Sequence, residues 1–86
     1  MEKTVVLGVL LDHRNDVAVD FQKILTKHGC NIRTRLGLHH ANNHKCPLGG
    51  VILLDVIGSD DDIASIENDI KSLPDTQVQK IMFEHS

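Results

Sequence analysis

The sequence predicts an α+β fold of the ferredoxin-like type, a βαββαβ sandwich in which two helices cover one face of a four-stranded antiparallel sheet. Three observations predict it. The 86 residues are enough for one domain but too few for two. Strand-like and helix-like segments alternate in the order β-α-β-β-α-β. The first and third strand segments, which are central in this fold, are apolar on both faces, whereas the second and fourth carry charges. We therefore expect residues 1–86 to form one domain.

The first strand and the first helix are predicted from residues 4–29. Residues 4–11 are apolar at nearly every position and have high β-propensity. Asn15 or Asp16 can then cap a helix, because their side chains accept hydrogen bonds from free backbone N–H groups. Gly29 stands where a left-handed residue commonly ends a helix. The apolar face of this helix follows the helical repeat: Val17, Phe21, Ile24, Leu25 and His28.

The second strand is predicted over residues 31–39, where the residues alternate in character. Ile32, Thr34, Leu36 and Leu38 fall on one side. Arg33 and Arg35 fall on the other side of what we expect to be an edge strand. Residues 40–50 are polar and end in Pro-Leu-Gly-Gly, so they predict a loop.

The second half of the chain predicts a strand, a helix and a closing strand. Residues 51–57 are apolar except for Asp55, and Gly58 ends the run. Ser59 followed by three aspartates indicates a helix start, because carboxylates favour the positive end of the helix dipole. Pro74 ends this helix, and residues 76–84 form the last strand. The apolar stripe of the helix is Ile63, Ile66, Ile70 and Leu73.

The uncovered face of the predicted sheet indicates self-association. Two helices cover one face only, so the apolar residues on the other face of the first and third strands need a different cover. A second copy of the chain is the most economical one. A domain of this size buries only roughly 60–65% of its unfolded surface and gains stability by association. We expect a homodimer or tetramer; the alternative is a monomer with an exposed apolar face.

Composition argues against several classes of partner. The net charge of −3 gives no general attraction to nucleic acid, and a chain with two Phe and no Trp or Tyr has little for bases to stack on. No apolar run approaches the roughly 20 residues of a membrane span. Two cysteines without a secretory signal indicate a reducing compartment, so we expect a cytoplasmic protein.

The densest polar segment suggests a metal site. His40, His44 and Cys46 follow the spacing His-x3-His-x-Cys, and imidazole with thiolate suits zinc, nickel, copper or iron. His28, at the end of the first helix, could add a ligand from the same or a neighbouring chain. The alternative is a solvated polar loop, because Lys45 beside Cys46 disfavours a bound cation.

A second candidate site lies at the turn after the first strand. Asp12, Arg14 and Asn15 precede the helix, and free N–H groups at a helix start beside an arginine suit a carboxylate or phosphate effector. The alternative is that the turn merely caps the helix. Arg33 and Arg35 could likewise bind an anion or pair with acidic residues of a second subunit.

Catalysis has little support in the sequence. No Ser-His-Asp or Cys-His pair stands in a recognisable motif, and the three consecutive aspartates are explained by the helix start. We therefore expect a protein that is not an enzyme.

Several segments resemble known regulatory families. The stretch from Val5 to Ile32, with its Asp12 turn, apolar helix and Gly-x-Asn-Ile exit, resembles ACT-type regulatory domains. That resemblance implies a ferredoxin-like fold that pairs through its sheets and binds small effectors near the turn after the first strand and at the subunit interface. Ile32-x-x-Arg-Leu-Gly-Leu38 and Val78-Gln-Lys-Ile81 resemble the second and last strands of the small iron-only hydrogenase system regulators.

A third resemblance bears on the metal. The C-terminal domain of the nickel-responsive repressor carries a His-x-His-x5-Cys run, and here His40 and Cys46 keep the x5 spacing while Leu38 stands at the first His position. The resemblance places His28 near the fourth ligand, which comes from across the interface. Together these observations predict a non-enzymatic, oligomeric regulatory or sensor module that binds a transition metal or small effector and acts on a protein partner. The alternative is a protein–protein interaction module without a ligand.

Overall fold

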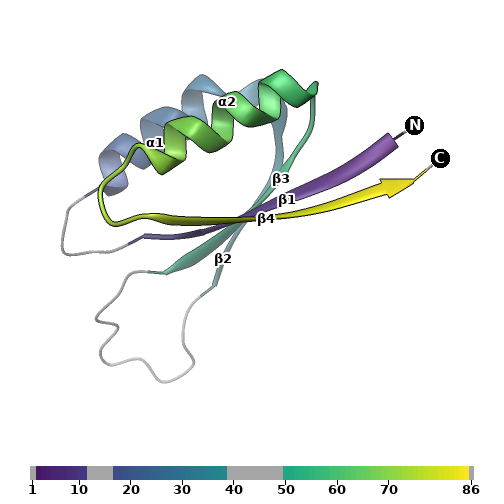
Figure 1. The fold of residues 1–86 in the computed structure, drawn as a ribbon. Helices are drawn as coiled ribbons and strands as arrows, with labels where there is room; N and C mark the ends of the chain where they lie inside the picture. The colour runs from purple at the N-terminus through teal and green to yellow at the C-terminus, as the bar shows by residue number, and fades with distance from the viewer. Residues whose placement is uncertain (1, 12–16, 39–49, 86) are drawn as a thin grey trace.

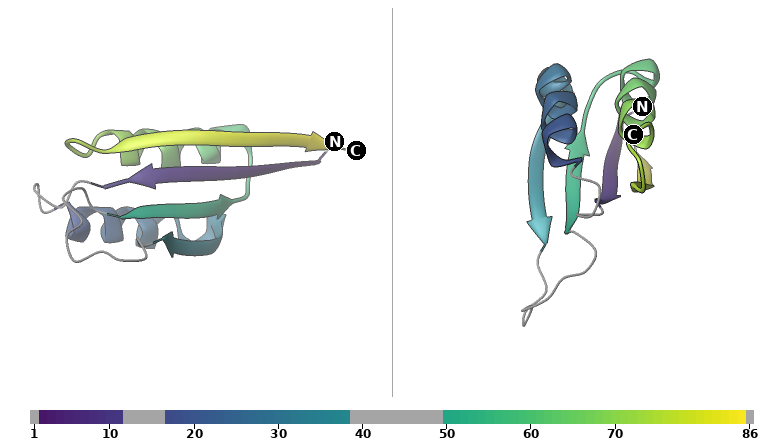
Figure 2. Two further views of the ribbon diagram at one scale, coloured as in Figure 1. Left: turned by 90° about the horizontal axis from the view of Figure 1, so that it is seen from below. Right: turned by 90° about the vertical axis from the view of Figure 1, so that its left-hand side faces the viewer.

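The computed structural model describes residues 2–11, 17–38 and 50–85. Both helices lie on one face of a four-stranded antiparallel sheet with the strand order β2-β3-β1-β4 (Figures 1 and 2). This arrangement confirms the predicted ferredoxin-like α+β fold, with the first and third strands at the centre. The elements are β1 (Glu2–Leu10), α1 (Ala18–Lys27), a short 3-10 helix η2 (Gly29–Asn31), β2 (Ile32–Leu38), β3 (Val51–Val56), α2 (Asp60–Lys71) and β4 (Gln77–His85).

The hydrophobic core lies between the helices and the two central strands. Alternate residues of β1 point into it, and in the register with β3 Val5 lies opposite Val56 and Leu7 opposite Leu54. Full burial of a Leu, Ile or Phe side chain contributes roughly 1.5–3 kcal/mol, so these residues supply most of the stability. The predicted helix stripes are confirmed. The buried helix residues are Val17, Phe21, Leu25, His28, Ile63, Ile66, Ile70 and Leu73, with Ile24 partly buried against them.

Helix α2 begins as the sequence predicts. The Ser59 hydroxyl accepts a hydrogen bond from the Asp62 backbone N–H, and the Asp62 carboxylate accepts one from the Ser59 N–H, which is a complete capping box. Gly58 precedes it with a φ of 130°. Helix α1 begins differently. Its N-cap is Val17, which is buried and makes no side-chain cap; the predicted caps, Asn15 and Asp16, lie outside the described residues.

The exit from α1 corrects a second expectation. Gly29 does not take a left-handed conformation; it lies in η2, which continues the chain in a tighter turn. The Asn31 backbone N–H donates to the His28 carbonyl oxygen at 2.8 Å, so this carbonyl is satisfied without a left-handed residue. Within the described ranges, positive φ values occur at Gly58 and Asp75.

A β-bulge in β2 overturns the expectation that Arg33 and Arg35 share one side. Ile32 lies opposite Val56 and Thr34 opposite Asp55, so Arg33 is an extra residue in the ladder. Period-two alternation holds only for an uninterrupted ladder. The bulge therefore leaves Arg33 beside Asp55, while Arg35 reaches Gln22 of α1 on the helix-covered face.

Candidate functional site

The predicted site residues fall mostly outside the described part of the chain. His28 is the one that lies inside it. The remaining metal candidates, His40, His44 and Cys46, and the effector candidates, Asp12, Arg14 and Asn15, lie outside the described residues and stay predictions.

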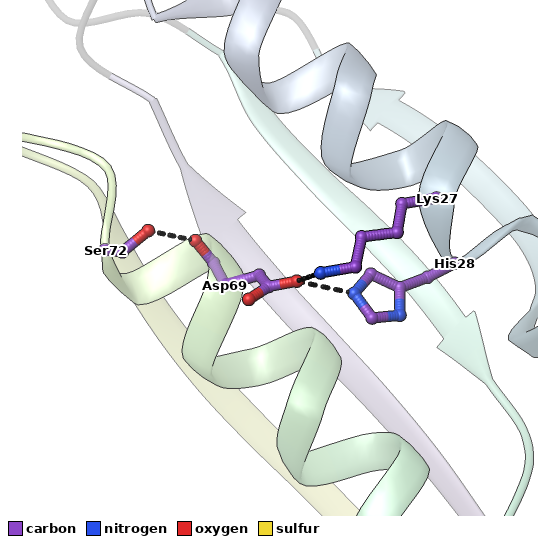
Figure 3. A network of polar contacts seen from close by, with 4 residues as sticks. All are labelled: Lys27, His28, Asp69 and Ser72. Atoms are coloured by element: carbon purple, nitrogen blue, oxygen red, sulfur yellow. Dashed lines mark hydrogen bonds and ion pairs between the residues drawn. The ribbon is translucent and has the colours of Figure 1, made fainter.

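His28 joins the two helices through a polar network. Its imidazole Nε2 lies 2.7 Å from Oδ2 of Asp69 on α2, and Nζ of Lys27 lies 3.1 Å from the same oxygen (Figure 3). The Ser72 hydroxyl donates to the Asp69 carbonyl oxygen at 2.6 Å. The hydrogen bond to His28, followed by that to Lys27, lowers the pKa of the Asp69 carboxyl.

This network bears on the predicted metal role of His28. Nε2 is engaged by Asp69, so Nδ1 is the ring nitrogen left for another ligand. Within the described ranges, no three His, Cys, Asp or Glu side chains gather closely enough to hold a metal ion. Any site using His28 would therefore need ligands from outside those ranges or from another molecule.

A hollow of about 390 Å³ lies between α1 and β2, and sequence reasoning missed it. Phe21 and Ile52 line it from the core side, and Gln22 and Arg35 supply its polar groups. The sequence of β2 alone gave no signal for it, because only the pairing with β3 after the bulge places Arg35 and Gly37 on the face toward the helices. Neither of these residues fills the space over the core. The other lining residues are Leu11, Ala18, Leu38, Gly50 and Val51.

The two arginines of β2 have different partners. Arg33 donates to both carboxylate oxygens of Asp55, at 2.9 and 3.3 Å, and this hydrogen bonding together with the charge of Asp55 raises the pKa of Arg33. Arg35 donates to the amide oxygen of Gln22 at 3.2 Å. The charge of Arg33 is therefore balanced by a carboxylate, whereas the partner of Arg35 in the described ranges is neutral.

The face of the sheet turned away from the helices, here called the open face, carries apolar residues on all four strands, with polar residues such as Thr34, Asp55 and Gln79 between them. Its residues are neighbours in register: Leu38 lies opposite Val51, which lies opposite Leu10, and Leu36 lies opposite Leu53. On the β4 side, Val6 lies opposite Ile81 and Thr4 opposite Phe83. Phe83 is 60% exposed and Leu36 53% exposed, so apolar surface lies open to solvent at both edges of the sheet.

None of the helices in the described part of the chain is long and apolar enough to cross a membrane. No model of a known protein family matches the sequence, and no curated protein matches it either.

Solved structures show the same fold at low sequence identity. An uncharacterized protein from Thermotoga maritima superposes with a TM-score of 0.80 at 15% identity, covering 96% of this chain and 100% of that one. The nitrogen regulatory PII-like protein CPII from Thiomonas intermedia K12, solved with ADP, AMP and bicarbonate, gives a TM-score of 0.50 at 12% identity, covering 99% and 97%. The cofactor-independent oxygenase SnoaB from Streptomyces nogalater gives 0.49 at 7% identity, covering 100% and 95%. At these identities the first two likenesses establish the fold alone.

Proposed function

We propose that this chain is a non-enzymatic regulatory module that works as a homo-oligomer, a homodimer or tetramer, joined through the open face. The observation that carries the proposal is the pair of adjacent apolar rows on that face, Leu36 with Leu53 and Leu38 with Val51 and Leu10. A small domain rarely leaves a contiguous apolar surface of this kind in water.

A second copy of the chain fits the open face better than other partners. A two-fold axis through the sheet sets the same apolar residues against each other, which is the commonest arrangement of soluble homo-oligomers. Arg33 and Asp55 on this face neutralise each other within one chain, which lessens the like-charge repulsion between two copies at that point. The net charge of −3 does not favour an anionic surface such as nucleic acid.

The regulatory role is supported by resemblance. The Ile32–Leu38 segment resembles the second strand of the iron-only hydrogenase system regulators, and the fold is shared with a protein described as a nitrogen regulatory PII-like protein. We propose that the module binds a transition metal or small effector and passes its state to a protein partner. Ligand binding at or near a subunit interface would stabilise the oligomer by mass action, which gives such a module a means of signalling.

The mass of the protein in solution tests this proposal. We expect light scattering of the full chain at micromolar concentration to give two or four times 9.6 kDa. Leu36→Asp places a charge on the open face and is expected to give a single chain with an unchanged circular dichroism spectrum. Val19→Asp, at a residue of α1 that is 60% exposed, is the matched control and should keep the wild-type mass. A wild-type mass of 9.6 kDa, or Leu36→Asp with the wild-type mass, contradicts the proposal.

A protein–protein interaction module without a ligand is the second candidate. It is favoured by the far end of the β1–β4 pair, which extends beyond the helices and carries both termini (Figure 2). Ile81, Met82 and Phe83 are each at least half exposed there, so both faces of the strand present apolar side chains. If neither metals nor a panel of amino acids and anions raises the melting temperature, this second candidate is the better description.

A further inference from the structure

The hollow between α1 and β2 exists because β2 places no large side chain over the core at that point. Gly37 lies opposite Ile52, on the face that the helices cover. An ideal Cβ built on Gly37 would meet no atom within 4 Å, so open space lies where a side chain would stand. The missing side chain at Gly37 therefore helps to keep the hollow open.

Among the described residues, the lining of the hollow combines apolar side chains with one positively charged side chain. Phe21, Leu11 and Ile52 contribute apolar surface, and Arg35 is the charged residue among the described lining residues. Within those ranges Arg35 has no carboxylate partner; its guanidinium donates to the neutral amide oxygen of Gln22. A guanidinium carries five N–H donors in a planar fork that matches a carboxylate, so several donors remain for a bound anion.

We propose that this hollow binds a small organic carboxylate with a branched aliphatic or aromatic body. The body would lie against Phe21 and Ile52, and the carboxylate would accept hydrogen bonds from Arg35. A volume of about 390 Å³ is within the range of small-molecule sites. This inference rests on the proposed function, because it gives the small effector a place and a chemical class; none of the described residues that line the hollow was predicted as a metal or effector ligand.

Three matched probes separate the effect of the ligand's charge from that of its shape. The contrast that matters is between 4-methylpentanoate and its neutral isostere 4-methylpentanamide, and 3-phenylpropanoate is the third probe, with an aromatic body on the same charge. We expect 4-methylpentanoate to shift the backbone amide resonances of Phe21, Gly37 and Ile52 in the full ¹⁵N-labelled chain. Charge-assisted hydrogen bonds from Arg35 should make it bind about ten-fold or more tightly than the amide.

Two pairs of variants locate the site. Arg35→Gln should weaken 4-methylpentanoate binding about ten-fold, whereas Arg33→Gln, which alters the arginine beside Asp55, should leave it unchanged. Gly37→Leu should fill the hollow and abolish binding. Gly29→Leu is its control, because Gly29 also has no atom within 4 Å of an ideal Cβ but lies outside the hollow. Circular dichroism of each variant establishes that it is folded.

These outcomes test binding in the hollow separately from the oligomeric state. Equal binding of the acid and the amide, undiminished binding to Arg35→Gln or to Gly37→Leu, or shifts confined to the open face would each overturn it. Light scattering of the same samples reports the oligomeric state. Absence of binding with an oligomeric mass rejects the pocket alone, whereas binding to a chain of 9.6 kDa supports the pocket and rejects the oligomer.

Discussion

Nε2 of His28 lies 2.7 Å from Oδ2 of Asp69, and this contact joins the C-terminal end of α1 to α2. His28 is the buried polar side chain of the described core, at 9% exposure, and Asp69 supplies its partner. A buried polar group is tolerated when it is hydrogen-bonded and is costly when it is not. The pair therefore fixes how the two helices sit against each other above the sheet.

Asp69→Asn should lower stability in a pH-dependent way. The pKa of Asp69 is lowered in the folded protein, chiefly by the hydrogen bond to His28 and then by that to Lys27. The carboxylate therefore stabilises the fold fully above its unfolded pKa of about 3.9, and this stabilisation is lost as the pH falls through the lower folded pKa. We expect the variant to be less stable by about 1 kcal/mol at pH 7, and this difference to narrow as the pH falls below the unfolded pKa of the carboxyl group.

Urea denaturation at pH 7, 5 and 3 measures this difference. Glu84→Gln, at an exposed carboxylate of β4, is the control and should have little effect at any of these pH values. A gap between Asp69→Asn and the wild type that stays constant down to pH 3 would show that the carboxylate charge is not what stabilises the contact.

Gly58→Ala should be strongly destabilising. Gly58 has a φ of 130°, which L-residues rarely adopt, and an added Cβ would lie 2.5 Å from Asn31 Nδ2 and 2.8 Å from Asp62 Oδ2. Asn31 is itself fixed, because its Nδ2 donates to the Ile57 carbonyl oxygen at 2.9 Å. We expect a loss of about 2–3 kcal/mol in thermal or urea unfolding.

Gly29→Ala is the matched control for that experiment. Its Cβ would meet nothing within 4 Å, and its backbone conformation suits an ordinary residue. The change should be neutral or stabilising by up to about 1 kcal/mol, since alanine restricts the unfolded chain. Similar losses at both glycines would contradict the argument from local geometry.

Ser59→Ala should remove one half of the capping box of α2. The Asp62 N–H would lose its acceptor, which lies at 3.1 Å, and we expect a loss of about 1 kcal/mol. Ser65→Ala in the middle of the same helix is exposed, and alanine is the better helix former, so this control should stabilise slightly. Chemical denaturation of both variants measures the free energy of unfolding, which should fall in Ser59→Ala and rise slightly in Ser65→Ala. A Ser59→Ala variant as stable as the wild type would refute the role of the cap.

The parts of the fold that were predictable are those determined by residues close together in the sequence. The stripe Ile63, Ile66 and Ile70 repeats at helical spacing, and Ser59 with Asp62 forms its capping box from neighbours three residues apart. Such features depend on residues close in the chain, so a pattern suffices to find them.

The parts that escaped prediction depend on pairing between distant residues. The bulge at Arg33 is defined only against β3, where Thr34 and Ile32 face adjacent partners, and an alternating pattern carries no sign of the extra residue. The hollow likewise needs α1 to lie beside β2. The missing side chain at Gly37 leaves a hollow only because Phe21 and Ile52 lie around it in the fold. Sequence periodicity indicates the face of a residue, whereas register decides what lies opposite it.

The metal prediction rests on His40, His44 and Cys46, with His28 as a fourth ligand, and is tested by titration. The full chain purified without a tag should bind nickel or zinc with a dissociation constant below about 10 µM, more tightly as the pH rises, because the ligands must lose their protons. A His40→Ala/Cys46→Ser variant should bind at least about ten-fold more weakly. His85→Ala is the control, because its imidazole contacts Thr4 Oγ1 at 3.2 Å and the spacing does not include it. Affinity unchanged in the double variant would show that these side chains are an ordinary polar segment, and the sensor would then have to respond to something other than a metal.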